Sequence, residues 1–212
     1  MLICRNTCIR RIRKMTEWEK AGKGYLYDAN NDPEVMEKHL SCLELCFELN
    51  ALSPMRKAER EEKLRRIIGS IGPDFDILSP FFCDFGENIH IGRNFYANHN
   101  LSILDGGRVS IGDYVFIAPN VVLTTAGHAI DPGQRDLGME IALPITIGSH
   151  VWLGANVTVM PGVRIGNNVV IGGGSVVTRD IPDNVIAVGN PCRILRPITD
   201  ADRHKYPIWD GE

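Results

Sequence analysis

The strongest constraint on the fold is an aliphatic residue that recurs every six positions in two uninterrupted series. The nine members are Ile111, Ile117, Leu123, Ile147, Leu153, Val159, Ile165, Ile171 and Val177. A second small apolar residue, such as Val109 or Val157, precedes eight of them by two positions. A spacing of two places both side chains on one side of a strand, and six is not a helical period. The series therefore predicts very short strands.

Turn-forming residues separate these strands, as in Pro119-Asn120 and Gly154-Ala155-Asn156. They suit tight or left-handed backbone, so a strand and a turn alternate every six residues. Such a chain coils and stacks each turn on the one before. The repeat resembles the hexapeptide of left-handed parallel β-helix proteins, in which three hexapeptides form one triangular turn and the prisms usually form trimers. We predict a mainly β chain with this fold.

The part before the repeat is predicted to be helical. Asp32-Pro33 and Ser53-Pro54 each place a capping side chain before a proline, which predicts two helix starts between residues 31 and 72. The first helix has an apolar stripe of Val35, Met36, Leu40, Leu43, Phe47 and Leu49. We predict four parts: an upstream extension or arm (1–14), a helical segment (15–72), the β-helix (73–196) with an extruded loop near 125–144, and a tail (197–212).

Composition argues against several classes of partner. With 23 Lys and Arg against 26 Asp and Glu, the net charge is -3, which favours neither nucleic acid nor an anionic membrane. No run of eighteen apolar residues exists, and no apolar segment follows the basic first residues as a secretory signal requires. We expect a cytoplasmic protein without a membrane anchor.

Six cysteines occur without a C-x-x-C pair, so reduced thiols are the expected state. Cys42 and Cys46 stand four apart on the first predicted helix. They could bind a metal in principle, but two small apolar side chains on one helix face are the simpler interpretation. No metal site is predicted.

The repeat is interrupted after Leu123 by the polar segment TTAGHAIDPGQRDLGMEIALP, which we expect to be an extruded loop. A rigid coil fixes the ends of such a loop while its side chains remain available for chemistry. Its one histidine is His128. A neutral imidazole can accept a proton at neutral pH, although loop histidines are more often only solvated.

Six segments make residues 21–196 similar to the maltose, galactoside and nodulation-type O-acetyltransferases. They are AGKGYLYDAN (21–30), NIHIGRNFYANHNLSILD (88–105), IAPNV (117–121), GHAIDP (127–132), PITIGSHVWLGANVTVMPGV (144–163) and NPCRILR (190–196). The resemblance implies direct transfer of an acetyl group from acetyl-CoA to a sugar hydroxyl, with His128 as general base and no metal. It also implies a homotrimer with active sites between subunits.

The resemblance assigns further roles. Asn98 matches an asparagine that binds the acceptor and supports the transition state, and Ala155 would act through its backbone N–H. The acceptor-binding residues implied are Asp28, Asp84, Tyr96, Asn98 and Glu140. Those implied for acetyl-CoA are Trp152, Ala155, Gly173, Thr178, Arg179, Arg193 and Arg196. Asp28 and Asp84 could equally cap a helix or close a turn. Asp84 and Glu140 favour glucose or maltose over a galactoside.

Other functions remain open on the same fold. The acceptor could be an antibiotic or a lipochitin-type amino sugar. A zinc carbonic anhydrase needs three histidines, two of them closely spaced, whereas His90, His99, His128 and His150 form no H-x-x-x-x-H pair. A non-catalytic trimeric assembly protein would not need the GHAIDP loop.

Overall fold

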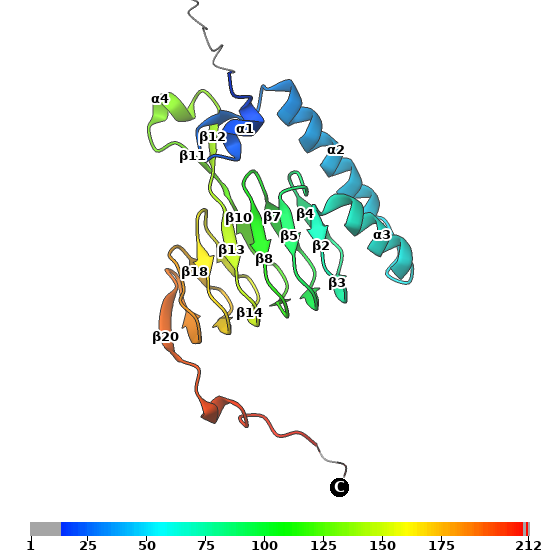
Figure 1. Ribbon diagram of the computed structural model, residues 1–212, viewed down its shortest axis with the longest axis vertical. Coiled ribbons are helices and arrows are strands. Elements are labelled where there is room, and N and C mark those ends of the chain that lie inside the picture. Colours follow the sequence, from blue (N-terminus) through cyan, green and yellow to red (C-terminus); the bar gives the residue numbers. More distant parts are fainter. Residues whose placement is uncertain (1–13, 210, 212) are drawn as a thin grey trace, which may run out of the picture.

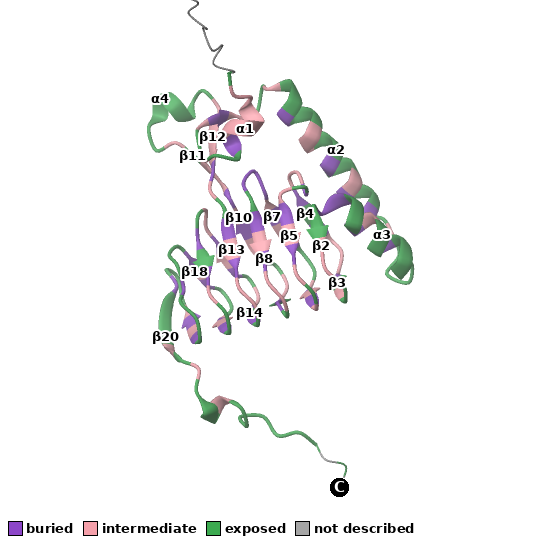
Figure 2. Ribbon diagram, in the orientation of Figure 1, coloured by how far each residue is buried: buried purple, intermediate pink, exposed green. Residues whose placement is uncertain are grey.

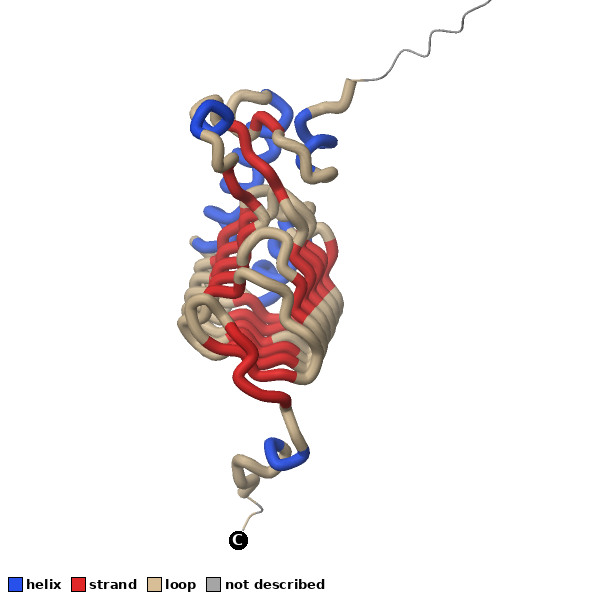
Figure 3. The backbone as a smooth tube through the Cα atoms, turned by 90° about the vertical axis from the view of Figure 1, so that its left-hand side faces the viewer, coloured by secondary structure: helices blue, strands red, loops and turns tan. Residues whose placement is uncertain are grey.

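The computed structural model describes residues 14–209 and 211, so all but the last residue of the predicted extension at 1–14 lies outside the described residues. Its main body is a left-handed parallel β-helix of about six turns, with strands stacked in three faces (Figures 1 and 3). The chain passes repeatedly from face 1 to face 2 to face 3 and back. We name the corners between them edge 1/2, edge 2/3 and edge 3/1.

Each face is a ladder of short parallel strands. Face 1 consists of β2 (Ser70–Ile71), β5 (Ile89–Ile91), β8 (Val109–Ile111), β13 (Ile145–Ile147) and β16 (Arg164–Ile165). Face 2 consists of β3 (Phe75–Ile77), β6 (Phe95–Ala97), β9 (Phe116–Ile117), β14 (Val151–Leu153), β17 (Val169–Ile171) and β19 (Val185–Val188), followed by antiparallel β20 (Arg193–Pro197). Face 3 consists of β4 (Phe81–Cys83), β7 (Leu101–Leu104), β10 (Val122–Thr124), β15 (Thr158–Val159) and β18 (Val176–Val177).

The predicted six-residue series forms the core, because all nine of its members are buried. In register, Leu123 of β10 lies between Ile103 and Val159, so aliphatic side chains stack directly on one another along the helix axis. The small residues two positions earlier, such as Val109 and Val157, are also buried. Burying these ladders supplies the main driving force for the coil.

The helical segment has three helices: α1 (Glu17–Ala21), α2 (Pro33–Asn50) and α3 (Lys57–Ile67). The predicted cap of α2 is confirmed, since the Asp32 side chain accepts a hydrogen bond from Val35 N at 3.1 Å. The prediction that Ser53-Pro54 begins the second helix is wrong. The Ser53 hydroxyl accepts from Met55 N at 3.3 Å and closes a local turn, and α3 starts only at Lys57.

The predicted apolar stripe of α2 is also wrong in part. Buried and exposed residues alternate along α2 (Figure 2). Val35 and Leu49 are buried as expected, but their companions on the inner face are Cys42 and Cys46. Four members of the predicted stripe are exposed instead, namely Met36, Leu40, Leu43 and Phe47. The helix packs against β4, where the small thiol side chains allow a close approach that the bulkier residues would prevent.

The polar segment that interrupts the repeat leaves the coil at edge 3/1. It contains β11 (Ala126–His128), α4 (Pro132–Arg135) and β12 (Met139–Ala142). We call these three elements together the arm, and keep the name extension for residues 1–14. The arm forms a three-stranded antiparallel sheet with β1 (Tyr27–Asp28), which lies in the helical segment between α1 and α2. Beyond β20, the C-terminal residues contain one 3-10 turn, η1 (Asp200–Asp202), and project away from the coil (Figure 1). Among the described residues, no helix has the length and apolarity needed to cross a bilayer.

Candidate active site

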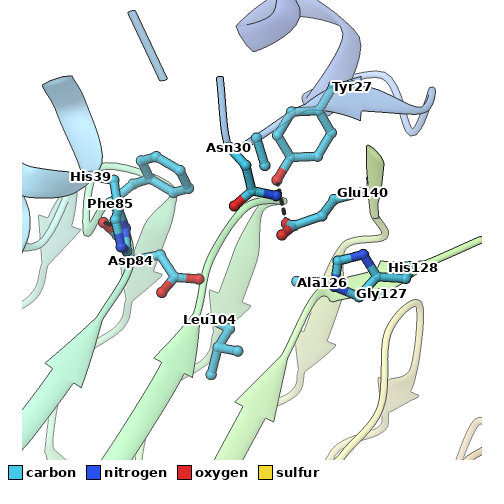
Figure 4. A pocket seen from close by; sticks show the side chains of 11 residues that line it. Tyr27, Asn30, His39, Asp84, Phe85, Leu104, Ala126, Gly127, His128 and Glu140 are labelled. Atoms are coloured by element: carbon cyan, nitrogen blue, oxygen red, sulfur yellow. Dashed lines mark hydrogen bonds between the residues drawn. The ribbon is translucent and has the colours of Figure 1, made fainter. Parts of the chain in front are cut away.

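A cavity of about 400 Å³ lies where the arm, the helical segment and edge 3/1 meet (Figure 4). It brings together three of the predicted site residues: Asp84, His128 and Glu140. The remaining lining residues are Tyr27, Ala29, Asn30, His39, Phe85, Leu104, Ala126 and Gly127. Acidic oxygens and the imidazoles of His39 and His128 thus line a space large enough for a small polar molecule.

His128 ends β11, and its hydrogen bond defines which ring nitrogen carries the proton. Nδ1 lies 3.2 Å from the carbonyl oxygen of Met139, and a carbonyl can only accept, so Nδ1–H is the donor. In the neutral ring, Nε2 then has a free lone pair. A fixed tautomer with Nε2 unprotonated is what a general base in this cavity requires.

Glu140 is held beside His128 by sheet register, because the two residues are partners in the β11–β12 ladder. On its other side Glu140 is paired with Tyr27 of β1, whose hydroxyl donates to Glu140 Oε2 at 3.2 Å. Burial, followed by the charge of Glu140, raises the pKa of Tyr27 well above its usual range. Tyr27 therefore remains a protonated donor and orients the carboxylate at neutral pH.

Asp84 follows β4 and faces Glu140 across the cavity (Figure 4). Burial, helped by the charge of Glu140, raises the pKa of Asp84 to about 6. The backbone here is firmly held: the Asp84 carbonyl accepts from His39 Nδ1 at 3.0 Å, and its N–H donates to Asp105 Oδ1 at 3.0 Å. This carboxyl group can accept a hydrogen bond from a ligand hydroxyl near neutral pH and donate one when protonated.

Asp28 lies next to the cavity, but its side chain is used in a turn. Asp28 Oδ1 accepts from the backbone N–H groups of Asn30 and Asn31 at 3.3 and 2.9 Å, and from Asn31 Nδ2 at 3.1 Å. The turn orients the segment that carries Asn30, which does line the cavity.

Asn98, Ala155 and Gly173 lie together on a different corner, edge 2/3. Each follows a face 2 strand (β6, β14 and β17) and precedes the next face 3 strand. The coils stack directly here, since Gly174 N donates to the Ala155 carbonyl at 2.8 Å. A Cβ at position 173 would lie 3.0 Å from that oxygen, so glycine permits the close stacking. The side chain of Asn98 accepts from His99 N at 2.7 Å.

The outer surface of face 2 leads to edge 2/3 and carries two further predicted residues. Tyr96, Phe116 and Trp152 follow one another in register on β6, β9 and β14. Phe116 and Trp152 are both about half exposed, at 52% and 53%. This strip is an exposed aromatic surface adjoining the corner that holds Asn98 and Ala155.

The remaining predicted residues lie on the late coils. Thr178 and Arg179 are exposed on edge 3/1, directly after β18. Arg193 is exposed in β20 and donates to the carbonyl of Cys192 at 2.7 Å. Arg196 forms a two-pronged ion pair with Asp202, with N–O distances of 2.7 and 2.6 Å, which commits its guanidinium to the C-terminal turn.

Sequence reasoning missed several residues of the cavity, including Tyr27, His39 and Phe85. Tyr27 and Phe85 stand directly beside the predicted Asp28 and Asp84, so adjacency was the only local signal. His39 gives no such signal, because its place depends on how α2 packs against β4.

Two families match parts of the chain. Residues 20–72 match the family described as the maltose acetyltransferase hexapeptide capping motif, and residues 144–179 match the bacterial transferase hexapeptide of six repeats. A putative acetyltransferase of Saccharomyces cerevisiae is 53% identical over 84% of this chain and 91% of its own. Galactoside O-acetyltransferase of Escherichia coli is 45% identical over 91% and 93%.

Solved structures agree in fold over nearly their whole length. A maltose O-acetyltransferase from Clostridium difficile is 44% identical, with a TM-score of 0.86 over 88% of this chain and 99% of its own. A galactoside acetyltransferase in complex with coenzyme A is 41% identical, with a TM-score of 0.86 over 93% and 98%. The shared capping motif and hexapeptide repeats, together with identities above 40%, show that this chain belongs to the hexapeptide-repeat O-acetyltransferase family of the maltose and galactoside type.

Proposed function

We propose that the enzyme transfers an acetyl group from acetyl-CoA to a hydroxyl of a small sugar bound beside His128, with His128 as general base. The observation that carries this proposal is the hydrogen bond from His128 Nδ1 to the Met139 carbonyl, which leaves Nε2 unprotonated at the cavity. Nε2 would take the proton of the acceptor hydroxyl while the hydroxyl oxygen attacks the thioester carbon. Collapse of the tetrahedral intermediate would break the C–S bond, and the imidazolium would return the proton to the leaving thiolate.

A sugar is the acceptor class that this cavity suits best. Asp84 and Glu140 face each other across it, and Asn30 adds an amide group that can donate or accept. Carboxylates are strong acceptors for the closely spaced hydroxyl groups of a sugar. The names of the relatives, maltose and galactoside O-acetyltransferases, point to the same class. Within that class, the acids at positions 84 and 140 favour glucose or maltose.

The coenzyme would bind along the late coils. Solved relatives include a complex with coenzyme A and, in Vibrio cholerae, one with acetyl coenzyme A at 36% identity. In this chain, exposed Gly173 and the backbone N–H of Ala155 would lie against the pantetheine arm. Exposed Arg179 and Arg193, and Thr178 beside them, would meet the nucleotide. Arg196 could contribute only by releasing Asp202.

The complete site would form between two subunits of a homotrimer. His128 extends from edge 3/1, whereas Asn98 and Ala155 lie on edge 2/3, with the whole width of face 3 between them. That width is up to four residues of strand, or roughly 13 Å. Packing edge 2/3 of one subunit against edge 3/1 of the next would bring these groups together and cover the exposed Trp152 and Phe116 strip.

The test is release of free thiol from acetyl-CoA by the wild type and by His128→Ala, with glucose, maltose, galactosides, glucosamine and chloramphenicol as acceptors. We expect kcat with the preferred sugar to fall by about 10²–10⁴-fold, since that is the usual contribution of a general base. Acetyl-CoA affinity and Tm should stay unchanged, because His128 is exposed and lies outside the core.

His204→Ala, which removes an exposed histidine of the C-terminal segment, is the matched control and should retain full activity. Turnover retained in His128→Ala would contradict the assignment of the base. Release with chloramphenicol or glucosamine alone would move the acceptor out of the simple sugars.

A further inference from the structure

Three cysteines meet between the helical segment and the β-helix, and none of them lines the cavity described above. Cys42 and Cys46 lie one turn apart on the inner face of α2, and Cys83 ends β4. Their side chains converge although Cys83 is distant in sequence. Cys83 Sγ lies 3.5 Å from Cys42 Sγ and 3.7 Å from Cys46 Sγ. All three residues are buried, with at most 4% of their surface exposed.

These distances match the sulfur positions of a three-coordinate metal site. Metal–thiolate bonds of about 2.3 Å place three sulfurs around one ion roughly 4 Å apart. The three Sγ atoms of the cluster all lie within 4.8 Å of one another, so an ion at their centre needs only small side-chain adjustments. The i, i+4 spacing places Cys42 and Cys46 on one face of α2, and this face packs against β4, which ends at Cys83.

The three thiols contact one another inside the core, since Cys83 Sγ lies within hydrogen-bonding distance of both Cys42 Sγ and Cys46 Sγ. Metal ions bind the thiolate form of cysteine, so an ion that enters the cluster displaces the thiol protons.

A route for the ion reaches the cluster from the surface. A groove of about 340 Å³ runs beside α2, and Cys42 is one of its lining residues. Its charges are balanced, because Glu37 and Glu87 are accompanied by Lys38 and Arg66, and Lys38 is paired with Glu87 at 2.7 Å. The interior around the sulfurs belongs to the continuous apolar core, which includes Leu49, Ile67 and Phe81.

We propose that Cys42, Cys46 and Cys83 form a binding site for a single soft metal ion, Cu(I) being the ion that fits best. Thiolate ligands select soft ions, and Cu(I) accepts three sulfurs without a fourth ligand. Structural Zn²⁺ sites are almost always tetrahedral, and within the described residues only these three His, Cys, Asp or Glu side chains converge on the site. Each thiol that becomes a ligand releases its proton to solvent, and the ion is not oxidised or reduced.

An occupied site would join α2 to β4 directly behind Asp84, which follows Cys83 in the chain. It would therefore stabilise the contact between the helical segment and the first coils. This inference does not depend on the acetyl-transfer proposal, because none of the three cysteines lines the cavity.

The experiment is anaerobic titration of the reduced, metal-free full-length protein with Cu(I), in competition with a coloured Cu(I) chelator, and a parallel titration with Zn²⁺. A background with Cys4→Ser and Cys8→Ser excludes the two cysteines outside the described residues. We expect one Cu(I) per chain, thiolate-to-copper absorption in the ultraviolet, and a rise in Tm of roughly 5–10 °C with ion in large excess over Kd. Zn²⁺ should bind at least 100-fold more weakly.

Cys192→Ser is the matched control, since Cys192 is also buried but stands alone on another part of the coil, and it should leave binding unchanged. Cys46→Ser should weaken Cu(I) binding at least 100-fold, and Cys46→Ala gives a second variant if the serine protein does not fold. Equal affinity of the background protein and the Cys46 variants would overturn the proposal and leave the cluster as core packing. Tighter binding of Zn²⁺ than of Cu(I) would overturn the choice of ion. The proposal would also be overturned if the reduced protein bound no Cu(I) and a Cys42–Cys83 disulfide formed in air, because the cluster would then be a redox pair.

Discussion

At the scale of single residues, the buried hydroxyl group of Tyr27 connects the helical segment to the arm. Tyr27→Phe removes the donor to Glu140 Oε2 while keeping the ring in the core. We expect a loss of about 0.5–1.5 kcal/mol of stability in urea unfolding, the usual cost of one such hydrogen bond. KM for the sugar should rise several-fold while KM for acetyl-CoA stays constant, because only the orientation of Glu140 changes. Tyr25→Phe, at an exposed position, should alter neither value.

Asp105 gives the protein a pH-dependent stability. It is fully buried, and within residues 14–209 its Oδ2 has no hydrogen-bond partner. Burial raises the pKa of Asp105 from 3.8 to about 6 despite the N–H donors of Asp84 and Phe85. Between these two pH values the folded state binds more protons than the unfolded state. The contribution of Asp105 to the free energy of unfolding therefore falls as pH rises from about 4 to 6.

The corresponding variant is Asp105→Asn, which keeps an oxygen for the two N–H donors but cannot ionise. The free energy of unfolding of the variant, measured relative to that of the wild type in urea, should increase by about 1–3 kcal/mol from pH 4 to pH 7. This follows from a pKa difference of about two units between the folded and unfolded states. Asp183→Asn is the control, because Asp183 accepts from Asn167 N in a similar turn but is exposed. An identical pH profile for wild type and Asp105→Asn would show that the buried carboxyl group does not titrate in this range.

The family resemblance identified three polar residues of the cavity but not its full lining. His128, Asp84 and Glu140 carry recognisable functional groups, and the structure brings them together. Tyr27 and His39 were not predicted, because their roles arise from partners more than forty positions away. A sequence pattern records spacing along the chain, whereas these contacts depend on how separate elements pack.

At the scale of elements, edge 1/2 is formed by a ladder of left-handed residues. The positive-φ positions on it are Asp74, Asn94, Tyr114, His150, Asn168 and Asn184. Asn168 has φ 52° and donates from Nδ2 to Asn184 Oδ1 at 3.0 Å. Asparagine tolerates this conformation, whereas alanine is strained there by roughly 1–2 kcal/mol.

Asn168→Ala and Asn168→Gly both remove that side-chain hydrogen bond, so they form a matched pair. Glycine adopts a positive φ freely, and we expect the glycine variant to be more stable than the alanine variant by about 1 kcal/mol in urea unfolding. Equal stability of the two variants would show that the backbone at this corner relaxes.

The strands were predicted more accurately than the helices for a physical reason. Every coil repeats the same environment, so nine aligned positions reinforce one interpretation. Helix α2 occurs once, and its sequence has apolar residues on two faces. Which face is buried depends on the shape of β4, and the cysteines that fit there look less hydrophobic than Phe47 or Leu40.

At the scale of the whole molecule, the separation of His128 from Asn98 permits a test of shared active sites. His128→Ala and Asn98→Ala chains should each be nearly inactive, by about 10²-fold or more. If one subunit supplies His128 and its neighbour supplies Asn98, trimers from an equal mixture of the two variants contain about a quarter of sites with both residues intact. We therefore expect co-expression to restore roughly that fraction of wild-type thiol release. A mixture as inactive as its components would place both residues of one site in the same chain.

The three-stranded sheet of β1, β11 and β12 has a consequence for how such enzymes diversify. Tyr27, Asn30, His128 and Glu140 all belong to this sheet or to its connections, whereas the coil beneath contributes Asp84 and a fixed platform. Residues 20–30 and 126–142 could thus be exchanged together between relatives, as one unit, to alter which acceptor is recognised. Such an exchange would leave the hydrophobic ladders unchanged, and also the late coils proposed for the coenzyme.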